Sequence, residues 1–192
     1  MRKIVLYTLM SLESDVDDPA GYFRSSPEPG RPPAFDRVME DNEDRIVSAQ
    51  DAVLLGRHMY DEWAGYWPTV SGSDVAFADF INNVKKYVVT STPLTKQWSN
   101  AEAVHGPIED VVRDLTARPG GDIGVHGSIT LAQSLLEADL VDELQLVVGP
   151  AFGFTGRRLF ANVEQVRRLE LLSATATPSG SVLLAYRVRR GG

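Results

Sequence analysis

Short apolar runs alternate with helical patterns along most of the chain, and this alternation limits the possible fold more than any other feature. Apolar residues recur with a period of about 3.6 between Phe35 and Ala49, as on one face of a helix. Expected strands occupy residues 3–10, 52–55, 86–91, 122–127 and 141–152. Expected helices start at 35 and after Gly56, and occupy about 74–84, 107–121 and 128–140. Such alternation predicts an α/β domain with a mainly parallel sheet.

The carboxyl-terminal segment departs from this alternation. Two apolar stretches flank the turn residues Pro178, Ser179 and Gly180 in "LELLSATATPSGSVLLAYRVR". From Val182 to Val188 every second residue is apolar, which is typical of a strand. We therefore expect an antiparallel hairpin here. The segment 13–34 is rich in Pro, Gly, Ser and acidic residues, and its length predicts a lid or a disordered connection.

Length and composition exclude several classes of protein. A chain of 192 residues suits one buried core, so we expect a single domain over 1–192. Cysteine is absent, which excludes disulfides and makes the cytoplasm the expected compartment. The 3 histidines are scattered and predict no metal site. A net charge of −7 without a long basic run predicts no nucleic-acid partner. No apolar run approaches the roughly 18 residues of a membrane span.

Three expected strands end in small or hydroxyl residues, in "VLLG-RH", "VVT-ST" and "GVHG-SI". In parallel sheets ligands bind beyond the carboxyl ends of the strands. A helix N-terminus attracts anions, and a glycine lets a phosphate approach the backbone. The recurrence favours a ligand with several phosphates, such as a dinucleotide. The alternative is that Gly56 simply ends a strand and Ser128 is only an N-cap, since the G-x-G-x-x-G motif is absent.

Longer segments resemble, in order, the dihydrofolate reductase-like superfamily. They are "LLGRHMYDEWAGYWP", "KKYVVTSTPL", "DIGVHGSITLAQSLLEADLVDELQLVVGPAFGFTGRRLF" and the terminal hairpin. The closest branch includes the reductase domain of the bifunctional riboflavin-biosynthesis deaminase-reductase. The resemblance implies a three-layer fold with a central mixed, mostly parallel sheet flanked by helices. It also implies NADPH bound across the strand ends and hydride transfer to a small-molecule substrate in the neighbouring cleft.

The resemblance assigns cofactor contacts to three groups of residues. At the phosphates lie Gly56, Arg57 and His58; near the adenosine end lie Thr90 and Ser91; at the pyrophosphate lie Gly127, Ser128 and Ile129.

Two positions depart from the family's pattern. Met59 stands where the family commonly has Thr, and Ser11-Leu12-Glu13-Ser14 stands where it tends to have Ser-Leu-Asp-Gly. Glu13 is therefore the candidate catalytic and substrate-contacting carboxylate. Two hypotheses follow. The first is an NADPH-dependent reductase of a riboflavin-pathway aminopyrimidine-like or pteridine-like substrate, and the second is a nucleotide-binding module of the same fold without catalysis.

Further candidates are less specific. Asn42 falls in the apolar stripe of the 35–49 helix, so it requires a partner, either nearby backbone or substrate. Trp63 is a candidate wall for a flat substrate ring, and the alternative is a place in the core. The family commonly forms homodimers, and the apolar strand "SVLLAYRVR" predicts an edge that needs a cover.

Overall fold

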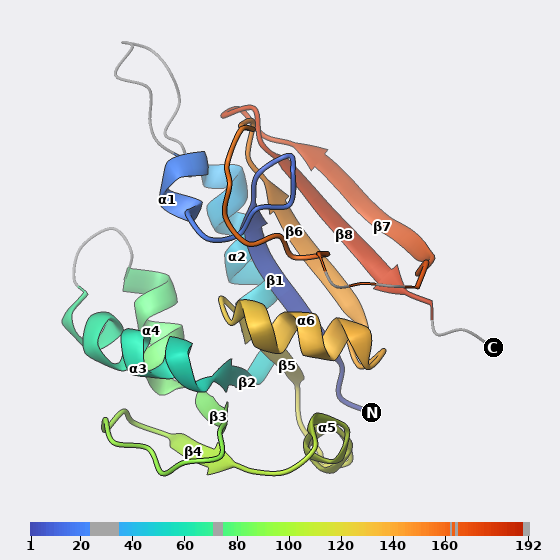
Figure 1. The fold of residues 1–192 in the computed structure, drawn as a ribbon. Coiled ribbons are helices and arrows are strands. Elements are labelled where there is room, and N and C mark those ends of the chain that lie inside the picture. The colour runs from blue at the N-terminus through green and yellow to red at the C-terminus, as the bar shows by residue number, and fades with distance from the viewer. Residues whose placement is uncertain (24–34, 71–74, 162, 164, 190–192) are drawn as a thin grey trace.

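The computed structural model describes residues 1–23, 35–70, 75–161, 163 and 165–189. Eight strands form one sheet in the order β4-β3-β2-β5-β1-β6-β8-β7 (Figure 1). The strands are β1 Ile4–Met10, β2 Gln50–Gly56, β3 Lys85–Val89, β4 Ala101–Val104, β5 Asp122–His126, β6 Glu143–Val148, β7 Leu169–Ala176 and β8 Val182–Val188. The first six strands pair in parallel, whereas β8 pairs antiparallel with β6 and β7. The predicted mixed sheet and terminal hairpin are confirmed.

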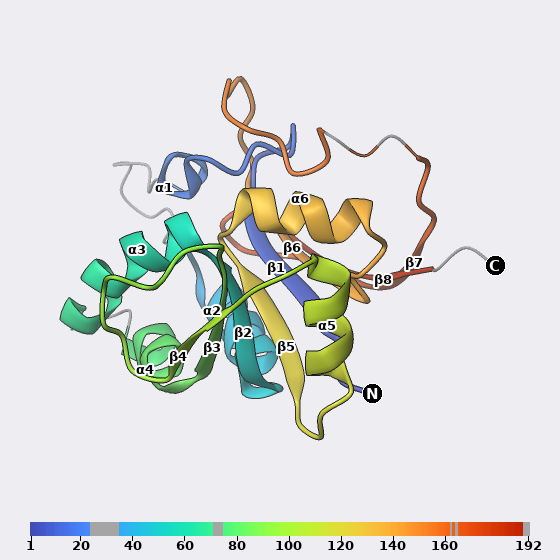
Figure 2. The same ribbon diagram turned by 60° about the horizontal axis from the view of Figure 1, so that its bottom comes forward.

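The helices form layers on the two faces of the sheet. They are α1 Pro19–Tyr22, α2 Arg37–Ser48, α3 Arg57–Tyr66, α4 Val75–Asn83, α5 Ile108–Thr116 and α6 Ile129–Glu137, with a 3-10 turn η1 at Trp67–Thr69. Figure 2 shows α5 and α6 in front of the sheet, with α2 behind it. Alternate residues of β1 reach the two layers. Leu6 packs with the core under α5 and α6, and Tyr7 packs with Met39 and Ile46 of α2.

Local chemistry accounts for where several elements begin and end. Helix α2 begins at Arg37 because the Asp36 carboxylate accepts hydrogen bonds from the backbone N–H groups of Val38 and Met39, at 3.0 and 3.2 Å. The strand expected over 141–152 ends earlier, at Val148, because Gly149 and Pro150 follow and proline has no N–H for the ladder.

Other boundaries also differ from the sequence prediction. The helices expected over 107–121 and 128–140 end at Thr116 and Glu137. Strand β4, Ala101–Val104, was not predicted, because four residues of mixed polarity at a sheet edge carry little periodic signal.

The described part of the 13–34 segment is bonded to a loop that follows β6. Asp15 forms a β-bridge with Arg158, and the Val16 N–H donates to the Arg157 carbonyl at 3.0 Å. The buried Asp15 carboxylate accepts a hydrogen bond from the Tyr22 hydroxyl, and burial together with this bond raises the pKa of Tyr22 to about 12. The rest of the predicted lid, 24–34, lies outside the described residues.

Candidate functional site

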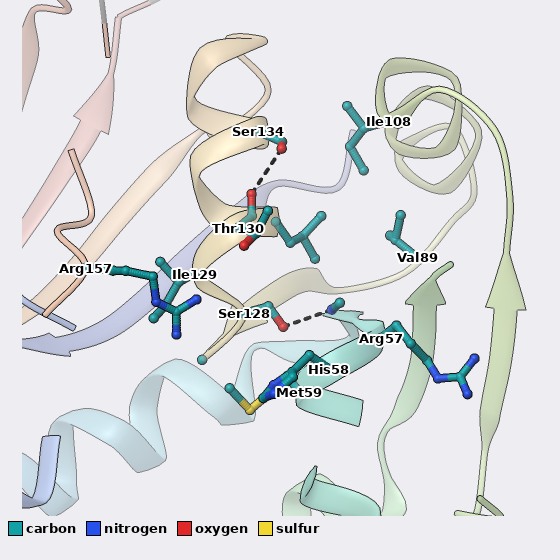
Figure 3. A pocket seen from close by; sticks show the side chains of 13 residues that line it. Arg57, His58, Met59, Val89, Ile108, Ser128, Ile129, Thr130, Ser134 and Arg157 are labelled. Carbon is teal, nitrogen blue, oxygen red and sulfur yellow. Dashed lines mark hydrogen bonds between the residues drawn. The ribbon is translucent and has the colours of Figure 1, made fainter. Parts of the chain in front are cut away.

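A pocket of about 360 Å³ lies where β2 passes into α3 and β5 passes into α6 (Figure 3). It is lined by Gly56, Arg57, His58, Met59, Val89, Ile108, Gly127, Ser128, Ile129, Thr130, Leu131, Ser134 and Arg157. None of these residues is acidic. Six of the eight predicted cofactor residues are therefore brought together: Gly56, Arg57, His58, Gly127, Ser128 and Ile129.

Two helices begin at this pocket without a side-chain cap. Neither Gly56 before α3 nor Ser128 before α6 makes a side-chain cap hydrogen bond, and neither helix has an acidic residue in its first turn. By contrast, Asp36 caps α2, and α5 has Glu109 and Asp110 in its first turn. Uncapped N–H groups and the helix dipole together favour an anion. The two helix ends at the pocket thus lack the carboxylates that would compete with a phosphate.

Ser128 joins the two helix starts. Its position as N-cap residue of α6 is confirmed, but its side chain does not cap that helix. The Oγ atom instead accepts a hydrogen bond from the backbone N–H of Gly56 at 2.9 Å (Figure 3). This bond fixes the end of β2 against the start of α6.

Gly127 is required by both conformation and space. Its φ of 67° lies in the left-handed region, where a Cβ is unfavourable. A Cβ at this position would also lie 2.9 Å from Trp63 Cζ2 and 3.0 Å from Met59 Cε. Met59, which replaces the family's common Thr, therefore packs against the turn that begins α6.

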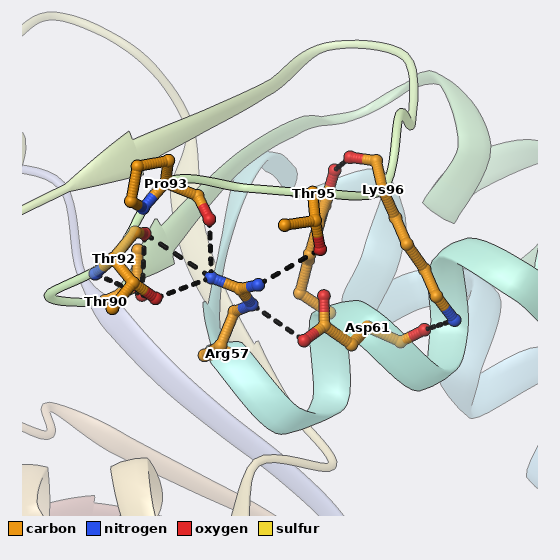
Figure 4. Close-up of polar contacts among 8 residues, drawn as sticks. Arg57, Asp61, Thr90, Thr92, Pro93, Thr95 and Lys96 are labelled. Carbon is orange, nitrogen blue, oxygen red and sulfur yellow. Dashed lines mark hydrogen bonds and ion pairs between the residues drawn. The ribbon is translucent and has the colours of Figure 1, made fainter.

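Arg57 lines the pocket, but its guanidinium is already hydrogen-bonded (Figure 4). Nε donates to the Asp61 carboxylate at 2.7 Å, and Nη1 donates to the Thr92 hydroxyl and the Pro93 carbonyl, each at 2.8 Å. Nη2 donates to the Thr95 hydroxyl at 3.2 Å. Figure 3 shows the side chain extending away from the start of α6. The predicted phosphate contact of Arg57 stays a prediction. The alternative is that Arg57 connects the start of α3 to the loop after β3.

Arg157 is a pocket residue that the sequence prediction missed. It lies in the loop after β6, and Figure 3 shows its guanidinium beside Ile129. Asp17 holds it, because the Asp17 carboxylate accepts from Nε at 2.8 Å and lies 2.6 Å from Nη2. The hydrogen bond to Asp17 raises the pKa of Arg157 further. The only sequence signal was "GRR" in a glycine-rich stretch, which does not reveal that this loop reaches α6.

The remaining predicted cofactor residues are more peripheral. The imidazole of His58 is exposed, and its Nδ1 lies 4.0 Å from the Glu62 carboxylate. Thr90 and Ser91 do not line the pocket. The Thr90 hydroxyl accepts from the backbone N–H of Thr92 at 3.1 Å. Their proposed contact with the adenosine end stays a prediction.

The predicted substrate residues lie outside the pocket lining. Glu13 accepts a hydrogen bond from the Gly153 N–H at 2.7 Å, and its other carboxylate oxygen lies 4.0 Å from Arg158 Nη2. The Asn42 carboxamide accepts a hydrogen bond from Arg45 at 2.9 Å. Asn42 thus has a side-chain partner rather than the backbone partner expected.

Trp63 belongs to an aromatic cluster behind the pocket. Its ring packs edge-on against Trp67 and Phe77, with centroids 5.7 and 6.1 Å apart. His126, the last residue of β5, lies 5.8 Å from the Phe77 ring and is buried. Burial lowers the pKa of His126 to about 4, so the imidazole is neutral near pH 7.

Over the described ranges, the side chains of His, Asp and Glu nowhere form a group of three that could bind a metal ion. Within the same part of the chain, no helix has the length and apolar character needed to cross a membrane.

The sheet order, the helical layers and the pocket at the strand ends define a dihydrofolate reductase-like α/β domain. Dihydrofolate reductase from Enterococcus faecalis, in a complex with NADP(H) and RAB-propyl, superimposes with a TM-score of 0.59 at 12% identity, over 98% of this chain and 97% of that one. A Shewanella sp. PV-4 protein described as a riboflavin biosynthesis protein has a TM-score of 0.74 at 17% identity, over 98% and 99%. At these identities the likeness shows the fold.

Sequence comparison identifies the family. The RibD C-terminal domain model matches residues 2–183, and the chain belongs to that family. The uncharacterized protein YyaP of Bacillus subtilis (strain 168) is 29% identical over 138 residues, which are 71% of this chain and 73% of YyaP.

Proposed function

We propose that this protein is an NADPH-dependent reductase that transfers a hydride to a small polar substrate of aminopyrimidine-like or pteridine-like chemistry. The observation that carries the proposal is the pocket in which two uncapped helix starts, Gly127 and Arg157 meet. Membership of the RibD C-terminal domain family supports it, as does the fold shared with a dihydrofolate reductase that binds NADP(H).

The residues present suit the phosphates of a dinucleotide. Gly127 forms the left-handed turn into α6, and the first turn of that helix offers backbone N–H donors. Arg157 adds a planar cation beside Ile129, the first residue of α6. Val89 and Ile108 supply an apolar wall for a flat part of the ligand. The bound cofactor would supply the hydride.

Calorimetric titration with NADPH tests the cofactor part of the proposal. Arg157→Ala should weaken binding about tenfold to a hundredfold, because hydrogen bonds to charged groups contribute about 1.5–3 kcal/mol. Arg158→Ala is the matched control, since this neighbouring arginine does not line the pocket. Failure of the unaltered protein to bind NADPH would contradict the proposal.

Turnover separates the reductase from a nucleotide-binding module without catalysis. A reductase oxidises NADPH in the presence of an aminopyrimidine-like or pteridine-like substrate, whereas the module binds NADPH and leaves it unchanged. Glu13 is the residue to test, because it is the predicted catalytic carboxylate. In the structure it accepts a hydrogen bond from the Gly153 N–H and does not line the pocket. If Glu13 orders substrate or relays a proton, Glu13→Gln lowers turnover by about 10²–10⁴-fold at unchanged NADPH affinity. Unchanged turnover would remove Glu13 from the mechanism.

We also infer a homodimer through the β7 edge of the sheet. The strand "SVLLAYRVR" was predicted to be an exposed edge, and this was wrong, because β8 pairs on both sides, with β6 and with β7. Among the described strands the edge is β7, which pairs with β8, and its Leu171 and Leu172 are exposed by 55% and 39%. An exposed apolar edge is usually covered. Light scattering at micromolar concentration should give a dimeric mass, and Leu171→Glu should lower it. Val166→Glu, at an exposed residue before the hairpin, should leave the mass dimeric. A monomeric mass for the unaltered protein would contradict the inference.

A further inference from the structure

Polar atoms without partners occur around His126, the last residue of β5, on the face of the sheet opposite α5 and α6. Among the described residues, His126 Nδ1, Gln50 Nε2 and Trp67 Nε1 are shielded from solvent and have no hydrogen-bond partner. The Tyr7 ring lies 5.6 Å from the His126 ring, and the Phe80 ring lies 6.1 Å from it. Buried polar atoms are nearly always paired in native proteins, so such a concentration indicates an absent partner.

The chain makes room for one pair in this cluster. Gln50 Oε1 lies 2.8 Å from His126 Nε2. Both side chains fold over the backbone of Gly124, where a Cβ would overlap the Gln50 carboxamide and lie 2.6 Å from His126 Nε2. The two glycines of "GVHG" therefore have different roles. Gly124 accommodates the His126–Gln50 pair, and Gly127 forms the turn into the pocket.

The hydrogen bond to Gln50 assigns the chemistry of the His126 ring. With the carboxamide oxygen as acceptor, the proton of the neutral imidazole is on Nε2. Nδ1 then presents a bare lone pair. A buried neutral imidazole in this tautomer accepts a hydrogen bond from an N–H or O–H group and offers no charge to attract an anion.

The cluster borders the pocket directly. His126 and Gly127 are consecutive, and Trp63 is within 2.9 Å of the place that a Gly127 Cβ would take. A planar ring bound against Trp63, Phe77 and His126 would lie beside a ligand of the pocket. The unpaired donors Trp67 Nε1 and Gln50 Nε2 complement ring carbonyl oxygens, and His126 Nδ1 complements a ring N–H.

We propose that His126, positioned by Gln50, selects the substrate of this reductase by accepting a hydrogen bond at Nδ1 from an N–H group of a planar heterocycle. The proposal rests on the proposed function, since it names the residue that distinguishes substrates beside the cofactor. Because Nδ1 is shielded from solvent, entry of the ring requires a rearrangement of the aromatic side chains around it.

Imidazole ¹⁵N NMR of the unaltered protein, recorded with and without an excess of NADPH, tests this directly. The chain has 3 histidines, so the His126→Phe variant assigns the His126 signals. The probes are a pyrimidinedione and a pteridinedione that carry ring N–H groups, each compared with its fully N-methylated analogue. We expect an N–H-bearing probe to shift the Nδ1 resonance and to bind about tenfold or more tightly than its methylated analogue.

Variants then show which residue causes the preference for the N–H-bearing probe. His126→Phe should abolish the preference for the N–H-bearing probe at unchanged NADPH affinity, and Gln50→Met should reduce it. His105→Phe, which replaces an exposed histidine outside the cluster, should keep it. Three outcomes would overturn the proposal. No probe binds, or His126→Phe keeps the preference for the N–H-bearing probe. The third is an Nδ1 resonance that does not change at probe saturation, as expected if an internal water is the partner of Nδ1. The response of Nδ1 is read on the unaltered protein, and His126→Phe serves there only to assign the His126 signals.

The two proposals fail separately. If NADPH does not bind but an N–H-bearing probe shifts Nδ1, the cofactor assignment is wrong and the His126 contact stands. If NADPH binds and is oxidised while Nδ1 never responds, the reductase stands and the role of His126 is wrong.

Discussion

Arg57 and His126 lie at the ends of neighbouring strands and differ in how completely their polar atoms are used. Each nitrogen of Arg57 donates to a residue of α3 or the loop after β3, so the side chain ties the two segments together. His126 uses one ring nitrogen, for Gln50, and the other has no partner among the described residues. Arg57, which the sequence predicts to bind a phosphate, has its nitrogens hydrogen-bonded within the protein. His126, to which the sequence assigns no role, has an unpaired Nδ1.

Unpaired polar atoms, more than residue type, indicate where the protein would gain a hydrogen bond from a ligand. An arginine beside a glycine suggests a phosphate, but Arg57 donates from all three nitrogens and must lose bonds to grip one, whereas the bonds of Arg157 to Asp17 use Nε and Nη2. A buried imidazole with an unpaired nitrogen gains a bond when a ligand arrives. Substitutions at His126, Gly127 and Arg57 test this difference.

The largest expected effect concerns the pH dependence of stability at His126. Its pKa is about 4 in the folded protein and near the ordinary value of 6.5 in the unfolded chain, because burial disfavours the imidazolium. The unfolded chain therefore binds the extra proton first. Stability from this group is fully present above pH 6.5 and is lost as the pH falls from 6.5 to 4, by at most about 3 kcal/mol.

Denaturant unfolding of the unaltered protein and of His126→Phe between pH 7 and pH 4 measures this loss. The variant should lose correspondingly less stability over the interval, since phenylalanine does not titrate. His58→Phe is the control, because the imidazole of His58 is exposed and lies outside the His126 cluster. Equal losses for His126→Phe and the unaltered protein would show that burial of His126 is not linked to stability.

The next effect concerns Gly127, where the pocket and the His126 cluster meet. Gly127→Ala should destabilise the fold by roughly 1–3 kcal/mol, through left-handed strain and the contacts with Trp63 and Met59. Gly106→Ala is the matched control. Its φ is also positive, at 108°, but nothing lies within 4 Å of the added Cβ. Only the Gly127 variant should weaken NADPH binding, and an equal effect of both substitutions on affinity would count against the pocket.

The smallest effect concerns Arg57. Arg57→Ala should cost about 1–2 kcal/mol of stability in chemical unfolding, because it removes bonds to Asp61 and to the 92–95 loop. NADPH affinity should then fall by less than about tenfold. A fall of roughly tenfold to a hundredfold would instead show that Arg57 releases its partners to grip a phosphate. Parallel titrations with NADH show whether that phosphate is the 2′-phosphate or the pyrophosphate.

Local sequence was sufficient for the frame of the molecule and for part of the site. Alternating apolar runs predicted the parallel strands, the period of two predicted the β7–β8 hairpin, and the glycines at 56 and 127 marked the two helix starts of the pocket. These features depend on neighbouring residues, because burial on one face of an element repeats with that element's own period. Short β4 lacks such a repeat, and its prediction failed.

Tertiary structure alone decided which polar groups meet. Arg157 reaches the start of α6 from a distant loop. Thr92 and Pro93 accept hydrogen bonds from the Arg57 guanidinium. Gln50 of β2 pairs with His126 of the neighbouring strand β5. These pairings depend on strand order, register and loop path, which no local pattern records. The amino-acid sequence thus determined the sheet, its hairpin and the place where the strands end. Packing decided which side chains there are satisfied, because a hydrogen bond requires two atoms to lie within about 3 Å, however far apart they are along the chain.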